Sequence, residues 1–109
     1  MTKIYNWYAQ KVAEFLHILD SIPEGNGTVL DNTLVVWGSE VGRGYDHSFF
    51  NMPFVLAGGG AGAIEMGRQY DFPEQAHNRL LVSICQAMGM STNAFGELDQ
   101  GDGALDFGV

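Results

Sequence analysis

The sequence predicts a mixed α/β fold, and three observations point to it. Apolar residues with helical spacing occupy residues 1–22, and two short apolar, β-branched runs follow within residues 32–60. A second helical pattern covers residues 77–89. Runs that are apolar on successive residues fit strands buried on both faces, as in parallel sheets covered by helices. We therefore expect one small α/β unit over residues 1–109.

The composition indicates a globular chain and excludes several classes of partner. The 109 residues are 46% hydrophobic, and 5 Lys and Arg against 13 Asp and Glu give a formal net charge of −8. Nucleic-acid backbones and anionic lipids both require clustered basic side chains, so neither nucleic acid nor a membrane surface is an expected partner. No apolar run approaches the roughly 18 residues that a membrane span needs. The single cysteine, Cys85, cannot form an internal disulfide, which leaves the compartment undecided.

The first helix is predicted from apolar residues at steps of three and four, which form one broad stripe. They are Ile4, Trp7, Tyr8, Val12, Phe15, Leu16 and Leu19. Pro23, followed by Gly25, ends the helix.

The two strands are expected at residues 32–38 and 52–57, and the second runs into the glycine-rich segment 58–62. Glycines let backbone amides approach an anion, so this segment invites interpretation as a phosphate loop. It lacks the Gly-Lys-Ser/Thr ending of such loops, so we favour a tight turn out of a buried strand.

The rest of the chain has three predicted parts. Residues 61–76 are a loop or a small hairpin, residues 77–89 are a helix, and residues 90–109 are an acidic, glycine-rich tail. Four apolar residues indicate that the tail packs on the surface of the protein: Phe95, Leu98, Leu105 and Phe107.

The loop between the two predicted strands carries the candidate metal ligands, Glu40, Asp46 and His47. Ligands in open α/β sheets bind beyond the carboxyl ends of strands, and Glu40 lies two residues past such an end. Carboxylate oxygens and a neutral imidazole suit a divalent cation such as zinc or manganese. The alternative is that Glu40 pairs with Arg43, that His47 hydrogen-bonds locally, and that nothing is bound. Spacing alone favours this alternative, because the loop offers at most three ligands.

No catalytic or cofactor-binding residue is assigned. Ser39 and Ser48 lack the Gly-x-Ser-x-Gly setting of a nucleophile elbow. His17 and His77 are interpreted as structural or surface histidines, and Cys85 as a small buried hydrophobic residue.

Residues 27–43, the Asp46-His47 pair and residues 51–60 resemble the C-terminal part of uncharacterised bacterial proteins related to the sulfatase and alkaline-phosphatase-like superfamily. The helix before this segment and the helix at 77–89 are similar to helices of the same proteins. The resemblance covers most of the chain but only the C-terminal portion of such a domain.

This resemblance implies a three-layer α/β/α sheet with a metal-bearing edge, of which this chain would supply a part. In catalytic members the first strand ends in an Asp-His pair that ligates metal, and here Ser39 and Glu40 take those positions. The later Asp46-His47 fits better, with His47 as the retained ligand. The nucleophile and the other ligands come from N-terminal strands that have no counterpart in this chain.

Three functions stay open. The favoured one is a C-terminal fragment or subunit of an alkaline-phosphatase/sulfatase-like domain that is not catalytic alone. The second is a metal-dependent phosphate- or sulfate-ester hydrolase whose site a partner completes, and the third is a non-catalytic oligomeric binding or assembly module.

Two strands are too few to build a covered sheet. We therefore expect a homo-oligomer or a missing N-terminal segment to complete it. Full-length relatives often carry an export signal, so the compartment stays open.

Overall fold

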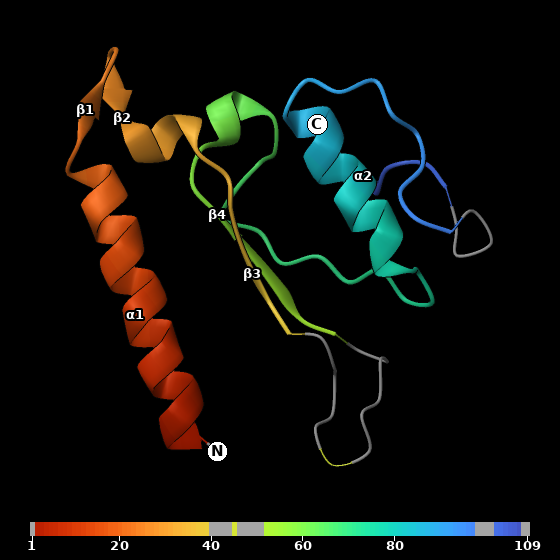
Figure 1. Cartoon of the computed structure of the whole chain (residues 1–109), viewed down its shortest axis with the longest axis horizontal. Coiled ribbons are helices and arrows are strands. Elements are labelled where there is room, and N and C mark those ends of the chain that lie inside the picture. The colour runs from red at the N-terminus through yellow and green to blue at the C-terminus, as the bar shows by residue number, and fades with distance from the viewer. Residues whose placement is uncertain (1, 40–44, 46–51, 98–101, 108–109) are drawn as a thin grey trace. The chain divides into compact units, whose positions relative to one another are not determined.

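The computed structural model describes residues 2–39, 45, 52–97 and 102–107, and it divides the chain into two compact units (Figure 1). Unit 1 is Met1–Ala61 and unit 2 is Gly62–Val109. The mixed α/β character is confirmed, because two α-helices and two small antiparallel sheets are present in the described residues. In this part of the chain, no helix combines the length and the apolar character that crossing a membrane requires.

Unit 1 begins with helix α1, Thr2–Asp20, none of whose residues is buried. Its partly buried residues recur at steps of three and four, as in a helix with one packed face. They are Ala9, Val12, Leu16 and Leu19. The broad stripe predicted from the sequence is therefore only partly used, since Trp7 and Phe15 stay about half exposed.

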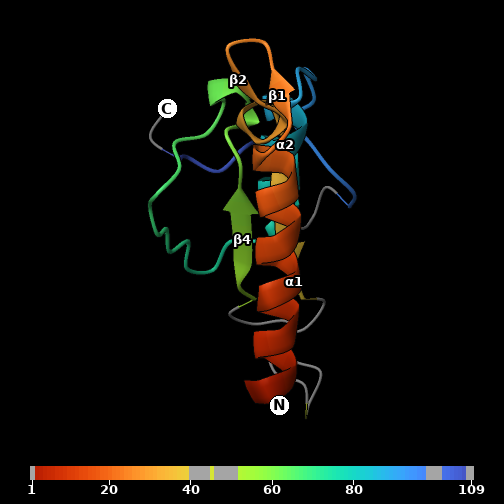
Figure 2. The same cartoon turned by 90° about the vertical axis from the view of Figure 1, so that its left-hand side faces the viewer.

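A tight hairpin follows α1 and leads the chain into a short 3-10 helix (Figure 2). Strands β1, Pro23–Glu24, and β2, Gly27–Thr28, pair antiparallel. The 3-10 helix η1, Val29–Asn32, comes next, and α1 packs against it. The Asp31 carboxylate accepts a 2.8 Å hydrogen bond from the Thr28 amide, which satisfies a donor at the start of η1.

The second sheet joins β3, Val35–Gly38, to β4, Phe54–Ala57, in an antiparallel pair. Its register runs from Val35 opposite Ala57 to Gly38 opposite Phe54. The expectation of a parallel sheet is wrong for these two strands. A run that is apolar on successive residues indicates that both faces of the strand are buried, but it does not indicate whether the strand pairs parallel or antiparallel.

The glycine-rich segment after β4 is a turn that docks onto η1. The Gly59 amide donates to the Leu30 carbonyl at 2.9 Å, and the Gly60 amide donates to the Thr33 carbonyl at 3.0 Å. A Cβ atom at Gly59 would overlap the backbone of Asp31. Only glycine allows the two backbone segments to approach this closely.

Unit 2 holds the apolar core of the described residues. Helix α2 spans His77–Ala87, and residues 63–76 contain no strand, so this stretch is a loop rather than a hairpin. The 3-10 turn η2, Gly60–Gly62, precedes it. Among the residues that the structure describes, four apolar side chains are buried, and all of them lie in unit 2. They are Ile64, Leu80, Val82 and Phe107.

The close approach at Gly59 predicts a large effect of a single methyl group. We expect Gly59→Ala to lower the free energy of unfolding by about 3 kcal/mol, because the backbone of η1 must move. Gly25→Ala is the matched control, since Gly25 has a φ of +57° but open space around it, and it should cost about 1 kcal/mol. Urea denaturation measures both values. Equal losses in the two variants would contradict the docking of this turn.

Candidate functional site

The three predicted metal ligands, Glu40, Asp46 and His47, lie outside the described residues. The structure describes the two ends of their loop, where Gly38 is paired with Phe54. A Cβ at Gly38 would lie 2.5 Å from Phe54 Cδ1, so the Phe54 ring covers Gly38. The chain therefore enters and leaves this loop at neighbouring points of one end of the β3–β4 sheet.

The other candidate ligands are not gathered into a site. Within residues 2–39, 45, 52–97 and 102–107, no three His, Cys, Asp or Glu side chains lie close enough together to hold a metal ion. His17 is exposed in the last turn of α1, and His77 is exposed at the first position of α2. Cys85 is a partly buried free thiol.

The glycine-rich segment behaves as a turn. The amides of Gly59 and Gly60 already donate to backbone carbonyls of unit 1, so they are not available to cradle a phosphate. The predicted turn out of the second strand is confirmed.

The most developed side-chain network of the described residues joins α2 to the tail. Arg79 Nη2 donates to the Ala104 carbonyl at 2.9 Å, and Arg79 Nε donates to the Gly103 carbonyl at 3.3 Å. A third nitrogen of the same guanidinium donates to the Gln75 side chain. The planar guanidinium thus fixes two successive backbone carbonyls of the tail against the helix.

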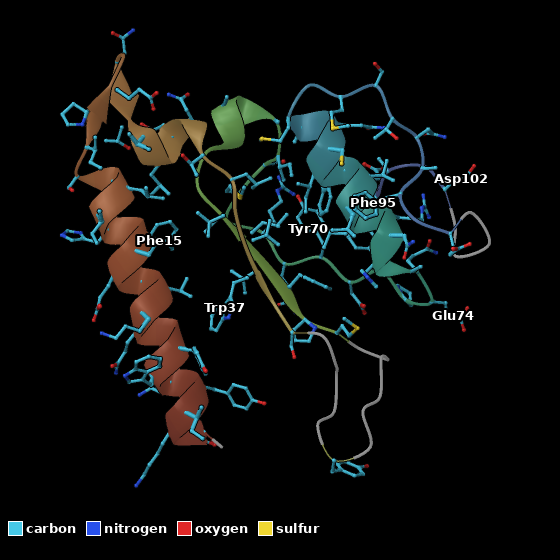
Figure 3. The ribbon with its side chains drawn as sticks, viewed as in Figure 1. Phe15, Trp37, Tyr70, Glu74, Phe95 and Asp102 are labelled. Carbon is cyan, nitrogen blue, oxygen red and sulfur yellow. The ribbon has the colours of Figure 1, made fainter. Side chains whose placement is uncertain are left out.

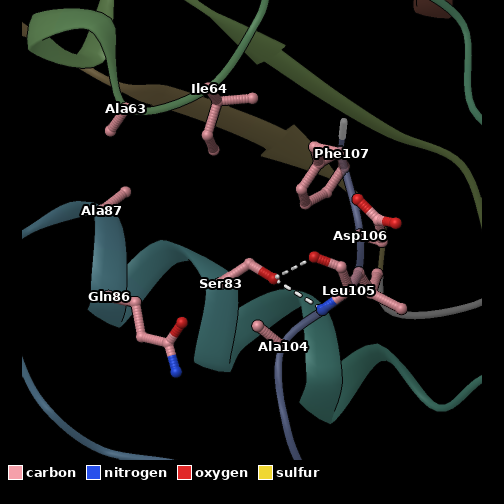
Figure 4. A pocket seen from close by; sticks show the side chains of 9 residues that line it. All are labelled: Ala63, Ile64, Ser83, Gln86, Ala87, Ala104, Leu105, Asp106 and Phe107. Carbon is pink, nitrogen blue, oxygen red and sulfur yellow. Dashed lines mark hydrogen bonds between the residues drawn. The ribbon is translucent and has the colours of Figure 1, made fainter. Parts of the chain in front are cut away.

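Ser83 makes the second attachment of the tail, one turn further along α2. Its hydroxyl is buried, accepts a 2.9 Å hydrogen bond from the Leu105 amide, and lies 3.5 Å from the Leu105 carbonyl (Figure 4). It also donates to the Arg79 carbonyl at 3.1 Å. Because a buried amide without a partner is costly, this hydroxyl sets the register of the tail on the helix.

Aromatic packing makes the third attachment. The Phe107 ring meets the Tyr70 and Phe72 rings edge to face, with centroids 5.0 and 5.4 Å apart. The hydroxyl of Tyr70, which Figure 3 labels, donates to the Phe107 carbonyl at 2.8 Å. Such contacts add to the burial of the ring itself. The expectation that the tail packs on the surface is met at its described end, where Phe107 is 7% exposed.

A hollow of about 320 Å³ lies along the seam between α2 and the tail (Figure 4). Its lining combines apolar side chains, such as Ile64 and Phe107, with the polar side chains of Ser83, Gln86 and Asp106. The Ser83 hydroxyl is already engaged with the tail backbone. Among the described residues no buried side-chain polar atom lacks a partner.

The sequence predicts apolar anchors in the tail but does not single out Phe107 from the other apolar residues, and Phe95 is 45% exposed. The polar anchors were not predicted. Arg79 and Ser83 carry no comparable signal, because their partners are backbone groups that depend on the tertiary fold. Comparison with protein-family models, curated proteins and solved structures finds no match for this chain.

The buried Ser83 hydroxyl predicts a specific local effect. We expect Ser83→Ala to lower the free energy of unfolding by about 1–2 kcal/mol, because the Leu105 amide loses its acceptor. Hydrogen exchange of that amide should accelerate. Ser21→Ala is the control, since the exposed Ser21 hydroxyl bonds only to the Ile18 carbonyl of its own helix end. Unchanged exchange at Leu105 would contradict the role of Ser83.

Proposed function

We propose that this chain is a non-catalytic part of an alkaline-phosphatase/sulfatase-like domain, in which β3 and β4 belong to a larger three-layer α/β/α sheet. The observation that carries this proposal is the absence of a buried apolar side chain from the described part of unit 1. The resemblance of the sequence to that superfamily supplies the identity of the domain.

Apolar side chains on both faces of the sheet support further cover. Val35, Trp37 and Val55 share one face, and Val36 shares the other with Leu56, since opposed residues in an antiparallel pair point the same way. Val36 and Val55 are 41% and 47% exposed, one on each face. A two-stranded pair is marginal by itself, and strands that are apolar on both faces belong to sheets covered by helices on both sides.

The lack of catalysis follows from the chemistry that the chain offers. A metal-assisted hydrolase needs a closed ligand set, an open coordination position and an activated nucleophile. In the superfamily the nucleophile and most ligands belong to N-terminal strands, for which this chain has no counterpart. Glu40, Asp46 and His47 would supply at most part of the ligand set.

A second candidate function keeps the same loop as part of a metal site. In this hypothesis the chain is a phosphate- or sulfate-ester hydrolase whose site a partner completes. The pairing of Gly38 with Phe54 favours it, because this pair fixes both ends of the loop that carries the three ligands. Zinc or manganese would be held by the carboxylates and by the neutral imidazole of His47, and would polarise the ester oxygen.

The first proposal predicts uncovered sheet faces in the chain alone. We expect the chain to bind an apolar fluorescent dye, and the Val36→Thr/Val55→Thr variant to bind less of it. Threonine keeps the β-branched shape, so the free energy of unfolding should change by less than about 1 kcal/mol. Dye titration and urea denaturation measure the two quantities. A wild-type chain without dye binding, or a loss of about 2 kcal/mol or more in the variant, would mean that the faces are already covered.

The second candidate predicts a metal site that depends on His47. Calorimetric titration of the wild type with zinc or manganese should then release heat. His47→Ala should bind the same metal at least about tenfold more weakly. His17→Ala is the control, because His17 is exposed on α1, and it should bind metal as the wild type does. Absence of heat in all three proteins removes this candidate. Turnover of chromogenic phosphate or sulfate esters that is lost in His47→Ala would instead overturn the non-catalytic proposal.

A further inference from the structure

Helix α1 exposes a second apolar stripe that its own unit does not cover. Steps of alternating four and three residues place the members of this stripe on one side of the helix. They are Ile4, Tyr8, Phe15 and Ile18, each 49–56% exposed, followed by Ile22 just beyond the helix. Figure 3 marks Phe15 among them. Exposed side chains of this size in one line indicate an interaction surface.

This exposed stripe is distinct from the side of α1 that packs. Each partly buried residue of α1 directly follows a position of the four-three series. Leu16, for example, follows Phe15. One residue corresponds to about 100° around the helix. The packed side of α1 and the exposed stripe therefore lie next to each other, and unit 1 leaves the exposed stripe uncovered.

A pair of opposite charges marks the midpoint of the stripe. Lys11 occupies the one position in the four-three series that is not apolar, and its Nζ lies 3.0 Å from a Glu14 carboxylate oxygen. The apolar positions are symmetric about Ala13, because Ile4 and Ile22 are equally distant from it, as are Tyr8 and Ile18. A helix that runs in the opposite direction with the same spacing would match the stripe along its whole length.

We propose that this stripe binds a second copy of the chain as an antiparallel helix pair with a two-fold axis near Ala13. With the axis at Ala13, Lys11 of each copy lies opposite Phe15 of the other copy. It is one residue, about 1.5 Å along the helix, from the position opposite Glu14, so its long side chain reaches the Glu14 carboxylate of the other copy, and symmetry makes this contact twice. The macrodipoles of the two helices also oppose each other, which favours the antiparallel direction. A parallel pair would instead place Lys11 against Lys11 and Glu14 against Glu14.

The exposed area is of the order that a dimer requires. A large apolar side chain covers about 150–250 Å² when fully buried, so five half-exposed members offer roughly 500 Å² per copy. The neighbouring Trp7 ring, with Lys11 Nζ 5.6 Å from its centroid, extends this surface. Small specific interfaces bury about 600 Å² per partner, so the stripe with its flanks has the size of a small interface. This inference does not rest on the proposed function, because it concerns α1 and not the sheet.

Charge reversal tests the pairing. Analytical ultracentrifugation of the full chain should show a concentration-dependent dimer. Lys11→Glu and Glu14→Lys should each weaken the dimer by at least about tenfold, because symmetry creates the like-charge contact twice. The two variants mixed in equal amounts should associate with each other, since one offers two acids and the other two bases. The double variant Lys11→Glu/Glu14→Lys should dimerise as the wild type does.

The mixture separates the interface from a structural role of the same ion pair. Loss of the pair within one helix would weaken each single variant, but it would not make the two variants bind each other. Lys3→Glu is the control for net charge, because Lys3 lies off the stripe, and its dimer should dissociate within about twofold of the wild-type concentration. A wild-type monomer at all concentrations, or single variants that dimerise normally, would overturn the proposal.

Discussion

The two units differ in what holds them together, and burial of apolar side chains is the constraint that separates them. All four buried apolar side chains of the described residues belong to unit 2. Unit 1 combines the partly buried packing of α1 on η1 with backbone hydrogen bonds, in the β3–β4 ladder and in the docking of Gly59 and Gly60 onto η1. Such bonds contribute only about 1 kcal/mol each, because water competes for the same groups. A unit that is built in this way gains most of its stability when its apolar faces are covered.

Unit 2 shows how an acidic, glycine-rich tail can still be held specifically. Its described end carries Asp102 and Asp106, yet the Arg79 guanidinium binds the carbonyls of Gly103 and Ala104. Ser83 likewise binds a backbone amide, and Phe107 supplies the apolar anchor. The helix therefore recognises the course of the tail backbone and one aromatic ring. The hydrogen bonds from Arg79 to Gly103 and Ala104 go to backbone carbonyls. The acidic side chains of the tail are therefore not needed for these two bonds.

Sequence patterns predicted the helices and strands of this chain better than the direction of strand pairing and the contacts between elements. The helical spacing at residues 1–22 and 77–89 and the two apolar runs at residues 32–60 correspond to α1, α2, β3 and β4. Strand direction was not predictable, because successive apolar residues give the same pattern in parallel and antiparallel pairs. The Arg79 and Ser83 contacts were not predictable either, because backbone carbonyls and amides 22 to 25 residues away leave no pattern in the sequence. The metal ligands Glu40, Asp46 and His47 stay a prediction.

The charge of the chain sets the roles of the groups in an α1 helix pair. Two copies with a net charge of −8 each repel one another, so association must be driven by the apolar stripe. Exposed ion pairs contribute little free energy, but they discriminate between orientations, because a wrong register brings like charges together. Lys11 and Glu14 are therefore suited to select the antiparallel register, and Tyr8, Phe15 and Ile18 to supply the affinity. A lysine in an otherwise apolar series fits this assignment of affinity to the apolar residues and of orientation to the charges. A fully apolar stripe would bind many apolar surfaces, whereas a central pair of charges favours a helix that runs in the opposite direction.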